Sequence, residues 1–561
     1  MKAARPDRGL VGSWQLAGDG HDGSGGDHHA LVQGTVTFGP STDPQWNGSV
    51  ARIDAGAGHL AVPTFPGLGT NDFSVSLWVN ASTASTATLG DLASLFDVRE
   101  RRGFSLGFQH GDVCGSHRND RNLFFGIDAG SEPRWTDYGR PTEDVVMIYA
   151  LVTHDGQLYA ATWEESSVSA PRGHVYRLDG ASWVDCGAPW DCNAVTRLTV
   201  HEGRLYAGVS RVKGGGSGRP ETGNANPGGR ILRYEGGTTW ADLGQLPGAD
   251  SIAGLVPFDG ALYATPLYSQ GVYRLGAAGG WEYVGGPGRR LLALGVHAGH
   301  LYGAGNDHVH VDSAIEQTAA GVVVPAESSE GGGGVFRYDG GQTWTSCGLQ
   351  PDTTQVYSIE THGGQLHIST WPTGLVFRQD GARWQNIGRL GVETEVMALV
   401  SYNGALYAGT LPHAEVFRYD RDDSWTMLRS LDQTPDVLYR RVHAMGVYRG
   451  ELFCGTLPSG RVYSLQTGLA VSHDRALGAG WHHVAAVRAA GQLELFVDGQ
   501  SVARRTAPEA GAAADLGSDA TLRLGGGPHA GMDGELAVVR LYDRALAASE
   551  VTSLAAGPRV A

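Results

Sequence analysis

The sequence contains no run of about 18 apolar residues, the length that a membrane-spanning helix requires, so it predicts no membrane span. Its 42 Lys and Arg residues are outnumbered by 58 Asp and Glu residues, which gives a net charge of -16. The basic residues do not gather into a patch, so we expect no nucleic-acid partner. Long helical periodicities are scarce, whereas 85 glycines indicate many short strands and tight turns.

Cysteine is also scarce, because five cysteines in 561 residues do not make a disulfide scaffold. Cys186 and Cys192 could close a small loop or could remain two free thiols. The first ten residues contain no apolar segment, so a signal peptide is absent from this sequence or already removed. Nothing in the composition indicates an oligomeric state.

A repeated phrase dominates the middle of the chain. Its first copy pairs "YALVTHDGQLYAAT" with "GHVYRLDGASWVDCG", and the first half of the phrase occurs seven times. Each copy contains four short alternating runs separated by turns, which predicts a four-stranded antiparallel meander. Units of this kind that repeat around an axis form a β-propeller, here with seven blades.

The seventh copy stops at "RVYSLQTG" and lacks the last strand, which carries Trp in the other copies. The isolated stretch "PRWTDYG" at 133–139 has the sequence of that missing strand. We therefore expect Trp135 to complete the seventh blade, because shared strand pairing closes the ring and leaves no open edge.

The turn "RYDGGQTW" resembles the Asp-box of sialidase-like and related propellers, through Asp339, Gly341, Thr343 and Trp344. Asp-boxes are structural turns remote from active sites. The resemblance therefore supports the fold and implies no catalytic residue.

Both ends of the chain resemble a laminin-G-like, concanavalin A-type jelly roll. The motifs are "FSVSLWV" before the repeats, and "WHHV", "FVDG" and "GELAVVRLYDRAL" after them. The resemblance implies an all-β chain in which a seven-bladed propeller at 133–466 is inserted into a sandwich made of 10–132 and 467–561. In this family the Trp-His-His run is a core strand, so His482 and His483 are expected to be structural.

A Gly-rich loop near the start, "DGHDGSGGDHH", resembles the loop that often holds a structural Ca²⁺ in such jelly rolls. Asp22 and Asp27 would be ligands, and Asp533 is the acid available from the last segment. An ordinary solvated loop is the alternative. No organic cofactor is expected.

Alignment of the repeats on their turn glycines exposes candidate site residues where the first strand enters each blade. Nine positions before the glycine, four blades carry a polar or charged residue in place of a small or apolar one: Arg290, Gln355, Glu395 and Arg441. Seven positions before it stand Tyr149, Tyr357 and His443. These residues should converge at one mouth of the central channel.

Further candidates occur at or just beyond the end of the second strand: Trp163, Asn306, Asp307, His308, Trp371 and His413. Aromatic faces and charge-assisted donors are what binding of a neutral or acidic sugar requires. His308, His310 and Asp312 alternate and could instead bind a metal, although their Gly-rich flanks favour a loop.

The leading hypothesis is an extracellular or periplasmic carbohydrate-active protein. Some seven-bladed propellers of similar design are polysaccharide lyases, which use His or Tyr as base and Arg or Gln to neutralise a uronate carboxylate. That resemblance implies catalytic roles for His443, Tyr357, Arg441 and Arg290. A hydrolase would need two carboxylates, for which Glu395 and Asp307 are available. A non-catalytic glycan-binding or adhesion protein and a protein-interaction scaffold are the alternatives.

Overall fold

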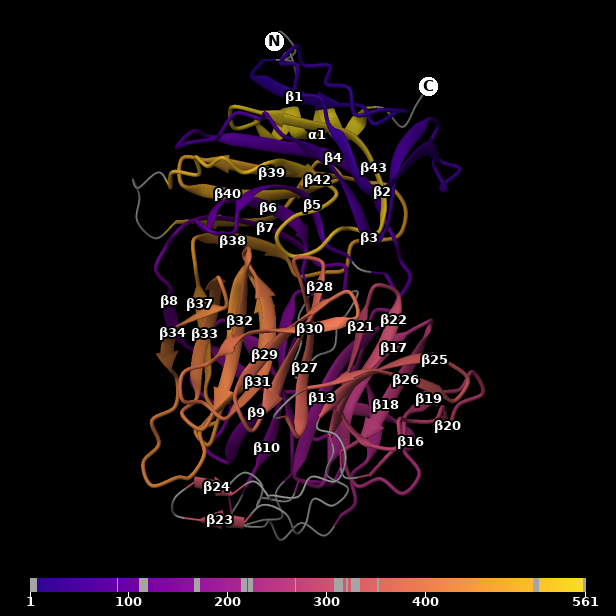
Figure 1. Cartoon of the computed structure of the whole chain (residues 1–561), viewed down its shortest axis with the longest axis vertical. Helices are drawn as coiled ribbons and strands as arrows, with labels where there is room; N and C mark the ends of the chain where they lie inside the picture. The colour runs from indigo at the N-terminus through magenta and orange to yellow at the C-terminus, as the bar shows by residue number, and fades with distance from the viewer. Residues whose placement is uncertain are drawn as a thin grey trace.

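A computed structural model describes most of the chain, namely residues 8–87, 89–109, 120–165, 172–212, 219, 226–267, 269–306, 316–318, 321–323, 333–350, 353–507 and 514–557. The structure is built from strands, with one described helix, α1 (Ala548–Ala556). No helix among these residues is long and apolar enough to cross a membrane. Figure 1 shows two stacked parts, a sandwich that contains both ends of the chain and a larger strand assembly below it.

The sandwich consists of one 13-stranded sheet to which both ends of the chain contribute. Phe73 contacts Phe104 and Phe125 at ring-centroid distances of 5.1 Å and 6.1 Å, although their strands lie far apart in the order of the sheet. The sheet therefore folds over and encloses a core. Its strands are β1 (Leu10–Trp14), β2 (Leu31–Pro40), β3 (Ser49–Val62), β4 (Phe73–Ala81), β5 (Asp91–Asp97), β6 (Arg102–Phe108), β7 (Leu123–Ala129), β38 (Leu469–His473), β39 (His482–Ala489), β40 (Gln492–Val497), β41 (Gln500–Thr506), β42 (Leu522–Leu524) and β43 (Gly534–Tyr542).

The remaining paired strands, apart from the small hairpin of β23 (Glu316–Thr318) and β24 (Gly321–Val323), form antiparallel groups of four. The first three groups are β9 (Val145–His154), β10 (Gln157–Glu164), β11 (Val175–Asp179) and β12 (Ser182–Asp185); β13 (Ala194–His201), β14 (Arg204–Ser210), β15 (Arg230–Gly236) and β16 (Thr239–Gln245); and β17 (Ile252–Phe258), β18 (Ala261–Pro266), β19 (Tyr273–Leu275) and β20 (Trp281–Tyr283).

The next three groups are β21 (Arg290–His297), β22 (His300–Asn306), β25 (Gly334–Gly340) and β26 (Thr343–Leu349); β27 (Gln355–His362), β28 (Gln365–Trp371), β29 (Leu375–Asp380) and β30 (Arg383–Arg389); and β31 (Glu395–Tyr402), β32 (Ala405–Leu411), β33 (Glu415–Arg421) and β34 (Ser424–Ser430). The last group is β35 (Arg441–Tyr448), β36 (Glu451–Leu457), β37 (Val462–Gln466) and β8 (Arg134–Asp137).

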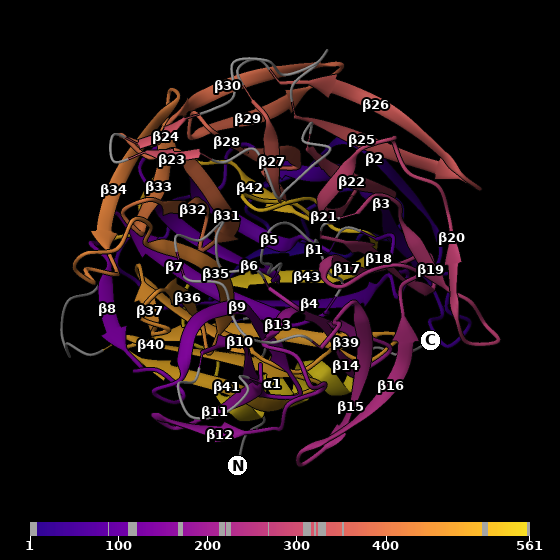
Figure 2. The same cartoon turned by 90° about the horizontal axis from the view of Figure 1, so that it is seen from below.

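The groups form a closed propeller. The first strands contact one another in the order β9, β13, β17, β21, β27, β31 and β35, and β35 contacts β9 again. Figure 2 shows these strands around the centre and the fourth strands at the rim. In the last group Trp135 lies opposite Leu465, as the isolated "PRWTDYG" stretch predicted.

Tryptophans on the fourth strands join neighbouring groups. The indole nitrogen of Trp425 donates a hydrogen bond of 2.9 Å to the carbonyl of Ile387 in the preceding group. Trp183 in the first group donates to the carbonyl of Tyr138, which directly follows β8. The same bond recurs from Trp240, Trp281, Trp344 and Trp384. The repeated Trp thus stabilises the rim, and the turn that contains Asp339 lies at the rim, away from the channel.

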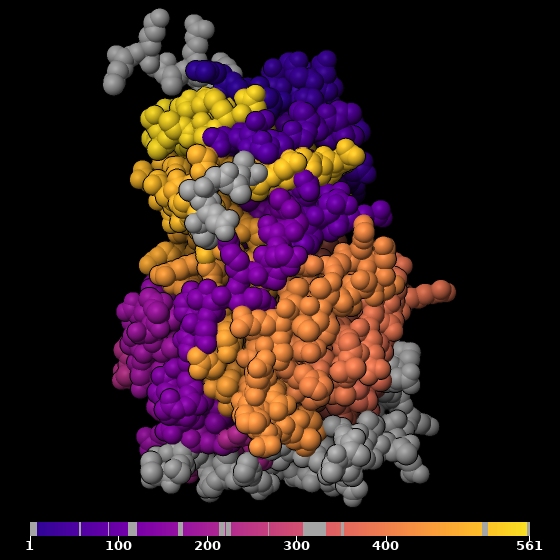
Figure 3. Space-filling view, turned by 90° about the vertical axis from the view of Figure 1, so that its left-hand side faces the viewer, coloured from indigo at the N-terminus to yellow at the C-terminus, as the bar shows by residue number. Residues whose placement is uncertain are grey.

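The sandwich packs on one end of the propeller (Figure 3), and hydrogen bonds fix which end. The amide of Gly156, in the turn between β9 and β10, donates to the carbonyl of Asp474 at 2.7 Å. The equivalent turn glycine Gly260 donates to the hydroxyl of Ser85 at 3.0 Å. The first strands therefore end at the sandwich and begin at the opposite end of the channel, which we call the far mouth.

Candidate functional site

The far mouth is formed by the residues at which the first strands begin, and it has a polar and an apolar side. Arg290, Gln355 and Glu395 are 8%, 7% and 7% exposed, and Arg441 is half-buried. The equivalent residues in the other groups are Met147, Ala194 and Ser251. Because the propeller forms with apolar or small residues there, the fold itself does not require the charges.

A β-bulge occurs at the same position in the first strand of every group. The pairing between first and second strand skips one residue each time, seven positions before the turn glycine. The skipped residues are Tyr149, Thr196, Ala253, Leu292, Tyr357, Met397 and His443. A bulge changes the direction of a side chain and is common next to active sites. Tyr149, Tyr357 and His443 thus occupy positions where the backbone departs from the regular sheet.

Tyr357, Glu395 and Arg441 form one electrostatic network from three neighbouring groups. Burial raises the pKa of the Glu395 carboxyl, although the charge of Arg441 and a hydrogen bond with Tyr357 oppose this rise. Burial and then the charge of Glu395 raise the pKa of Tyr357 well above its ordinary value, with Arg441 and Arg290 opposing. Tyr357 is therefore a protonated hydroxyl at neutral pH, set between a carboxyl group and two guanidinium groups.

His443 lies beside this network and is 5% exposed. Its ring packs edge-on against Tyr149, with 5.2 Å between the ring centroids. Burial, followed by the positive charges of Arg197 and Arg441, lowers the pKa of His443 well below its ordinary value. The imidazole is therefore neutral at pH 7.

The two tryptophans near the far mouth, predicted to bind substrate, are buried. Trp163 and Trp371 pair with residues at the start of first strands, but they are 0% and 2% exposed. Trp163 packs in an apolar cluster with Met147 and Leu457. Because both side chains are buried, the prediction that they stack on a sugar ring does not fit this arrangement.

Asn306, another predicted substrate-binding residue, is 1% exposed and pairs with both Arg290 and Gln355. It connects two groups at the mouth. Asp307 and His308, together with the suggested metal-binding alternation that continues to Asp312, lie outside the described residues.

His413 is half-exposed and fixed by a buried acid. Its Nδ1 lies 2.5 Å from a carboxylate oxygen of Glu393, whose side chain is fully buried. Glu393 also accepts hydrogen bonds from the hydroxyl of Thr410 at 2.7 Å and from the amide of His413 at 3.1 Å. The other ring nitrogen of His413 has no hydrogen-bond partner among the described residues, and a role in substrate binding stays a prediction.

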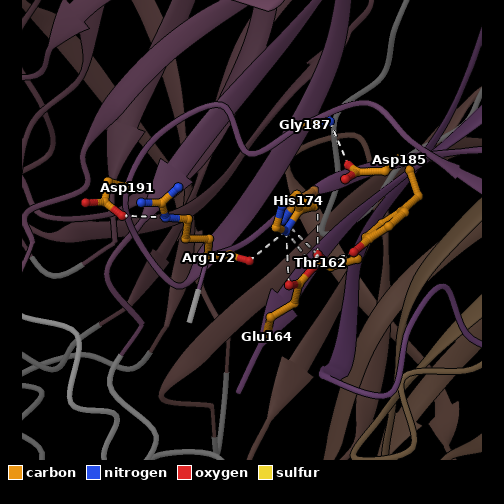
Figure 4. Close-up of polar contacts among 8 residues, drawn as sticks. Thr162, Glu164, Arg172, His174, Asp185, Gly187 and Asp191 are labelled. Atoms are coloured by element: carbon orange, nitrogen blue, oxygen red, sulfur yellow. Dashed lines mark hydrogen bonds and ion pairs between the residues drawn. The ribbon is translucent and has the colours of Figure 1, made fainter. Parts of the chain in front are cut away.

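A second His–Glu pair was not anticipated from the sequence (Figure 4). His174 Nδ1 lies 3.0 Å from Glu164, which also accepts hydrogen bonds of 3.0 Å from the hydroxyls of Thr162 and Tyr176. Burial lowers the pKa of His174, but the bond and the charge of Glu164 outweigh this effect and raise it above its ordinary value. In both His–Glu pairs a threonine hydroxyl donates to the glutamate, from Thr162 to Glu164 and from Thr410 to Glu393. A threonine alone is too weak a signal in the sequence to predict such a pair.

The loop of the predicted calcium site is stabilised by Asp22 itself. Its two carboxylate oxygens accept hydrogen bonds from the amides of Ser13, Ser24 and His28 and from the hydroxyl of Ser24, at 2.8–3.0 Å. Asp27 is exposed. In the described part of the chain no group of three or more His, Cys, Asp or Glu could hold a metal, and calcium binding by Asp22, Asp27 and Asp533 stays a prediction. Because protein donors already surround Asp22, it serves as the organiser of the loop.

Two of the cysteines and the two histidines of the Trp-His-His run contribute to packing and hydrogen bonding within the fold. Cys186 and Cys192 are buried free thiols, so the small loop is not closed by a disulfide. His483 is 1% exposed, and its ring nitrogen lies 2.8 Å from the hydroxyl of Ser76. His482 lies 2.7 Å from a carboxylate oxygen of Asp498.

Comparison with protein families supports the sandwich. Residues 448–552 match the family model Laminin_G_3, described as the concanavalin A-like lectin/glucanases superfamily. The chain therefore carries a concanavalin A-like domain, and the match covers the second part of the sandwich together with the last propeller strands before it. No curated protein matches the sequence significantly.

Solved propellers show a distant likeness. Virginiamycin B lyase from Staphylococcus aureus, in a catalytically inactive form with quinupristin, is 11% identical with a TM-score of 0.44, over 60% of this chain and 100% of that chain. A gluconolactonase from Xanthomonas campestris is 15% identical with a TM-score of 0.32, over 57% and 98%. The WD40 propeller domain of Doa1 is 10% identical with a TM-score of 0.38, over 59% and 97%. Similarity at this level says nothing about activity.

Proposed function

We propose that this protein binds a carboxylate-bearing polysaccharide at the far mouth of the propeller and cleaves it by β-elimination. The observation that carries the proposal is the convergence of Arg290, Arg441, Tyr357, Glu395 and His443 at one mouth. In three other groups the positions equivalent to Arg290, Glu395 and Arg441 hold Met147, Ala194 and Ser251. Guanidinium groups bind carboxylates through paired charge-assisted hydrogen bonds. Arg290 and Arg441 would neutralise the uronate group and so make the adjacent C–H more acidic.

At neutral pH the other groups have the protonation states that complementary roles require. Neutral His443 would take the proton next to the carboxylate, and the electron pair of that C–H bond would form a C=C bond as the glycosidic C–O bond breaks. The Tyr357 hydroxyl would donate its proton to the leaving oxygen. Glu395 would orient Tyr357 by hydrogen bonding, and solvent would return the proton from His443 to Tyr357.

Binding without cleavage is the second candidate. It is favoured by the burial of His443 and by the contacts within the Tyr357, Glu395 and Arg441 network. Either activity is most useful where such polysaccharides occur, so we expect an extracellular or periplasmic location.

The test is incubation of the protein with polygalacturonate, while ultraviolet absorbance of unsaturated uronate and reducing ends are measured in parallel. We expect both signals to rise, and we expect His443→Gln and Arg441→Gln to lower kcat/KM by about a hundredfold or more. Arg383→Gln, an exposed arginine at the rim, is the matched control and should leave the rate unchanged. Binding without either signal would support the second candidate, and reducing ends without absorbance would indicate hydrolysis.

A further inference from the structure

A groove with a cavity volume of about 340 Å³ lies between the sandwich and the propeller, at the end opposite the far mouth. Hydrogen bonds between the two parts fix its walls. The amide of Gly363 donates to the carbonyl of Pro528 at 3.1 Å, and the amide of Gly404 donates to Nε2 of His529 at 2.8 Å. His529 is in turn held by Asp91, 2.8 Å from its Nδ1. The groove is therefore preformed, as small-ligand sites usually are.

Four arginines from four different elements line this groove. Arg99 follows β5 and Arg523 lies on β42 in the sandwich, while Arg378 lies on β29 and Arg421 ends β33 in the propeller. Arg99, Arg421 and Arg523 are exposed. Such a concentration of positive charge is notable in a chain of net charge -16.

Most of this positive charge lacks a counterion. No ion pair is formed by Arg99, Arg378 or Arg523 among the described residues. Arg378 donates to the side-chain oxygen of Gln385 at 2.6 Å, but its buried Nε has no hydrogen-bond partner within the described part of the chain. The positive charge of Arg378 is thus not neutralised by a carboxylate among the described residues, and an anion in the groove would be stabilised by it.

The acidic residues of the groove only partly offset these charges. Asp420 is occupied by Arg418, whose Nε donates to it at 2.7 Å. Asp422 is 84% exposed and lies 3.9 Å from Arg421. Burial lowers the pKa of His367 to about 4, so this residue adds no charge at neutral pH. The groove therefore has a positive balance carried by Arg99, Arg378 and Arg523.

We infer that this groove is a second binding site, distant from the far mouth. It binds the anionic groups of a polyanionic saccharide. Carboxylate and sulfate ester groups both match the guanidinium donors. Another cavity between the two parts, of about 630 Å³, contains Arg121 and Arg475 but also the exposed acids Glu202 and Asp259, which would repel the same chain. The identification of the polyanion as a saccharide rests on the proposed function, whereas the binding of an anion does not.

The experiment compares the variant R99Q/R523Q with the matched control R204Q/R383Q, which removes two exposed arginines outside the groove. Binding of polygalacturonate, dextran sulfate and neutral dextran is measured by calorimetry at two salt concentrations. We expect R99Q/R523Q to weaken binding of at least one polyanion by about tenfold and to reduce its salt dependence, because two charge-assisted contacts are lost. The control should bind as the unaltered protein does, and the preferred polyanion distinguishes carboxylate from sulfate.

A kinetic measurement separates this inference from the proposed function. R99Q/R523Q should raise KM for the polymer and leave kcat unchanged, whereas Arg441→Gln should lower kcat and leave groove binding intact. Equal polyanion binding by R99Q/R523Q and the control, or no polyanion binding at all, would overturn the inference. Groove-dependent binding without any turnover would refute only the proposed elimination. Melting temperatures of all variants show whether each is folded.

Discussion

At the scale of single residues, burial decides which protonation states the molecule holds. At the far mouth desolvation lowers the pKa of His443 and raises that of Tyr357, so His443 stays neutral and Tyr357 stays protonated. The same effect operates at Asp474, where the two parts of the molecule meet. Its carboxylate accepts hydrogen bonds from the amide of Arg449 and the hydroxyl of Ser472, yet burial raises its pKa to about 6.

Asp474 should therefore make stability depend on pH in a defined direction. Because its folded-state pKa lies above the unfolded value of 3.8, its stabilising contribution is complete below that value and is lost as the pH rises through about 6. On acidification from about pH 7.5 to about pH 5, the unaltered protein should gain about 1.4 kcal/mol of unfolding free energy relative to Asp474→Asn. Urea unfolding of both proteins at the two pH values measures this difference, and parallel pH profiles would show that Asp474 does not titrate in this range.

At the scale of elements, the repeated tryptophan joins one group of strands to the next. Six of these indoles donate to a carbonyl of the preceding group, whereas Trp135 on β8 makes no such bond among the described residues. Instead the guanidinium group of Arg429 lies 5.6 Å from its ring centroid. The rim is thus held by side-chain bonds as well as by strand pairing.

Trp425→Phe should lower the unfolding free energy by about 1–2 kcal/mol, because an aromatic ring is kept while the hydrogen bond from the indole nitrogen to Ile387 is lost. Trp135→Phe is the matched control and should cost less, since phenylalanine keeps most of the contact with Arg429. Denaturant unfolding of the two variants is the measurement. Equal losses would mean that ring packing alone, and not the hydrogen bond, stabilises the rim.

Much of this architecture could be predicted from the sequence. The repeat predicts the groups of four strands, and the isolated "PRWTDYG" stretch predicts the pairing of Trp135 with the last group. The bulges could not be predicted, since they depend on the register between two strands. The burial of Trp163 and Trp371 was missed because it depends on packing between neighbouring groups. The hydrogen bonds that Asp22 accepts from backbone amides could not be predicted either, because a carboxylate in a Gly-rich loop has the same sequence whether it binds an ion or backbone amides.

At the scale of the whole molecule, the two ends of the propeller have different surroundings. The sandwich covers one end and creates the arginine-lined groove there, whereas the far mouth lies at the other end (Figure 1). A long polyanion could be held at the groove while one of its uronate groups enters the far mouth. In this account the groove between the sandwich and the propeller contributes binding, and the far mouth of the propeller contributes the chemistry.

The most direct test of the central claim is a crystal structure of His443→Gln, in which turnover should be blocked, with a bound oligogalacturonate. The account predicts sugar density at the far mouth, with one carboxylate within hydrogen-bonding distance of the guanidinium groups of Arg290 and Arg441 and the glycosidic oxygen beside the Tyr357 hydroxyl. An oligosaccharide that binds only elsewhere, with the far mouth empty at saturating concentration, would contradict it.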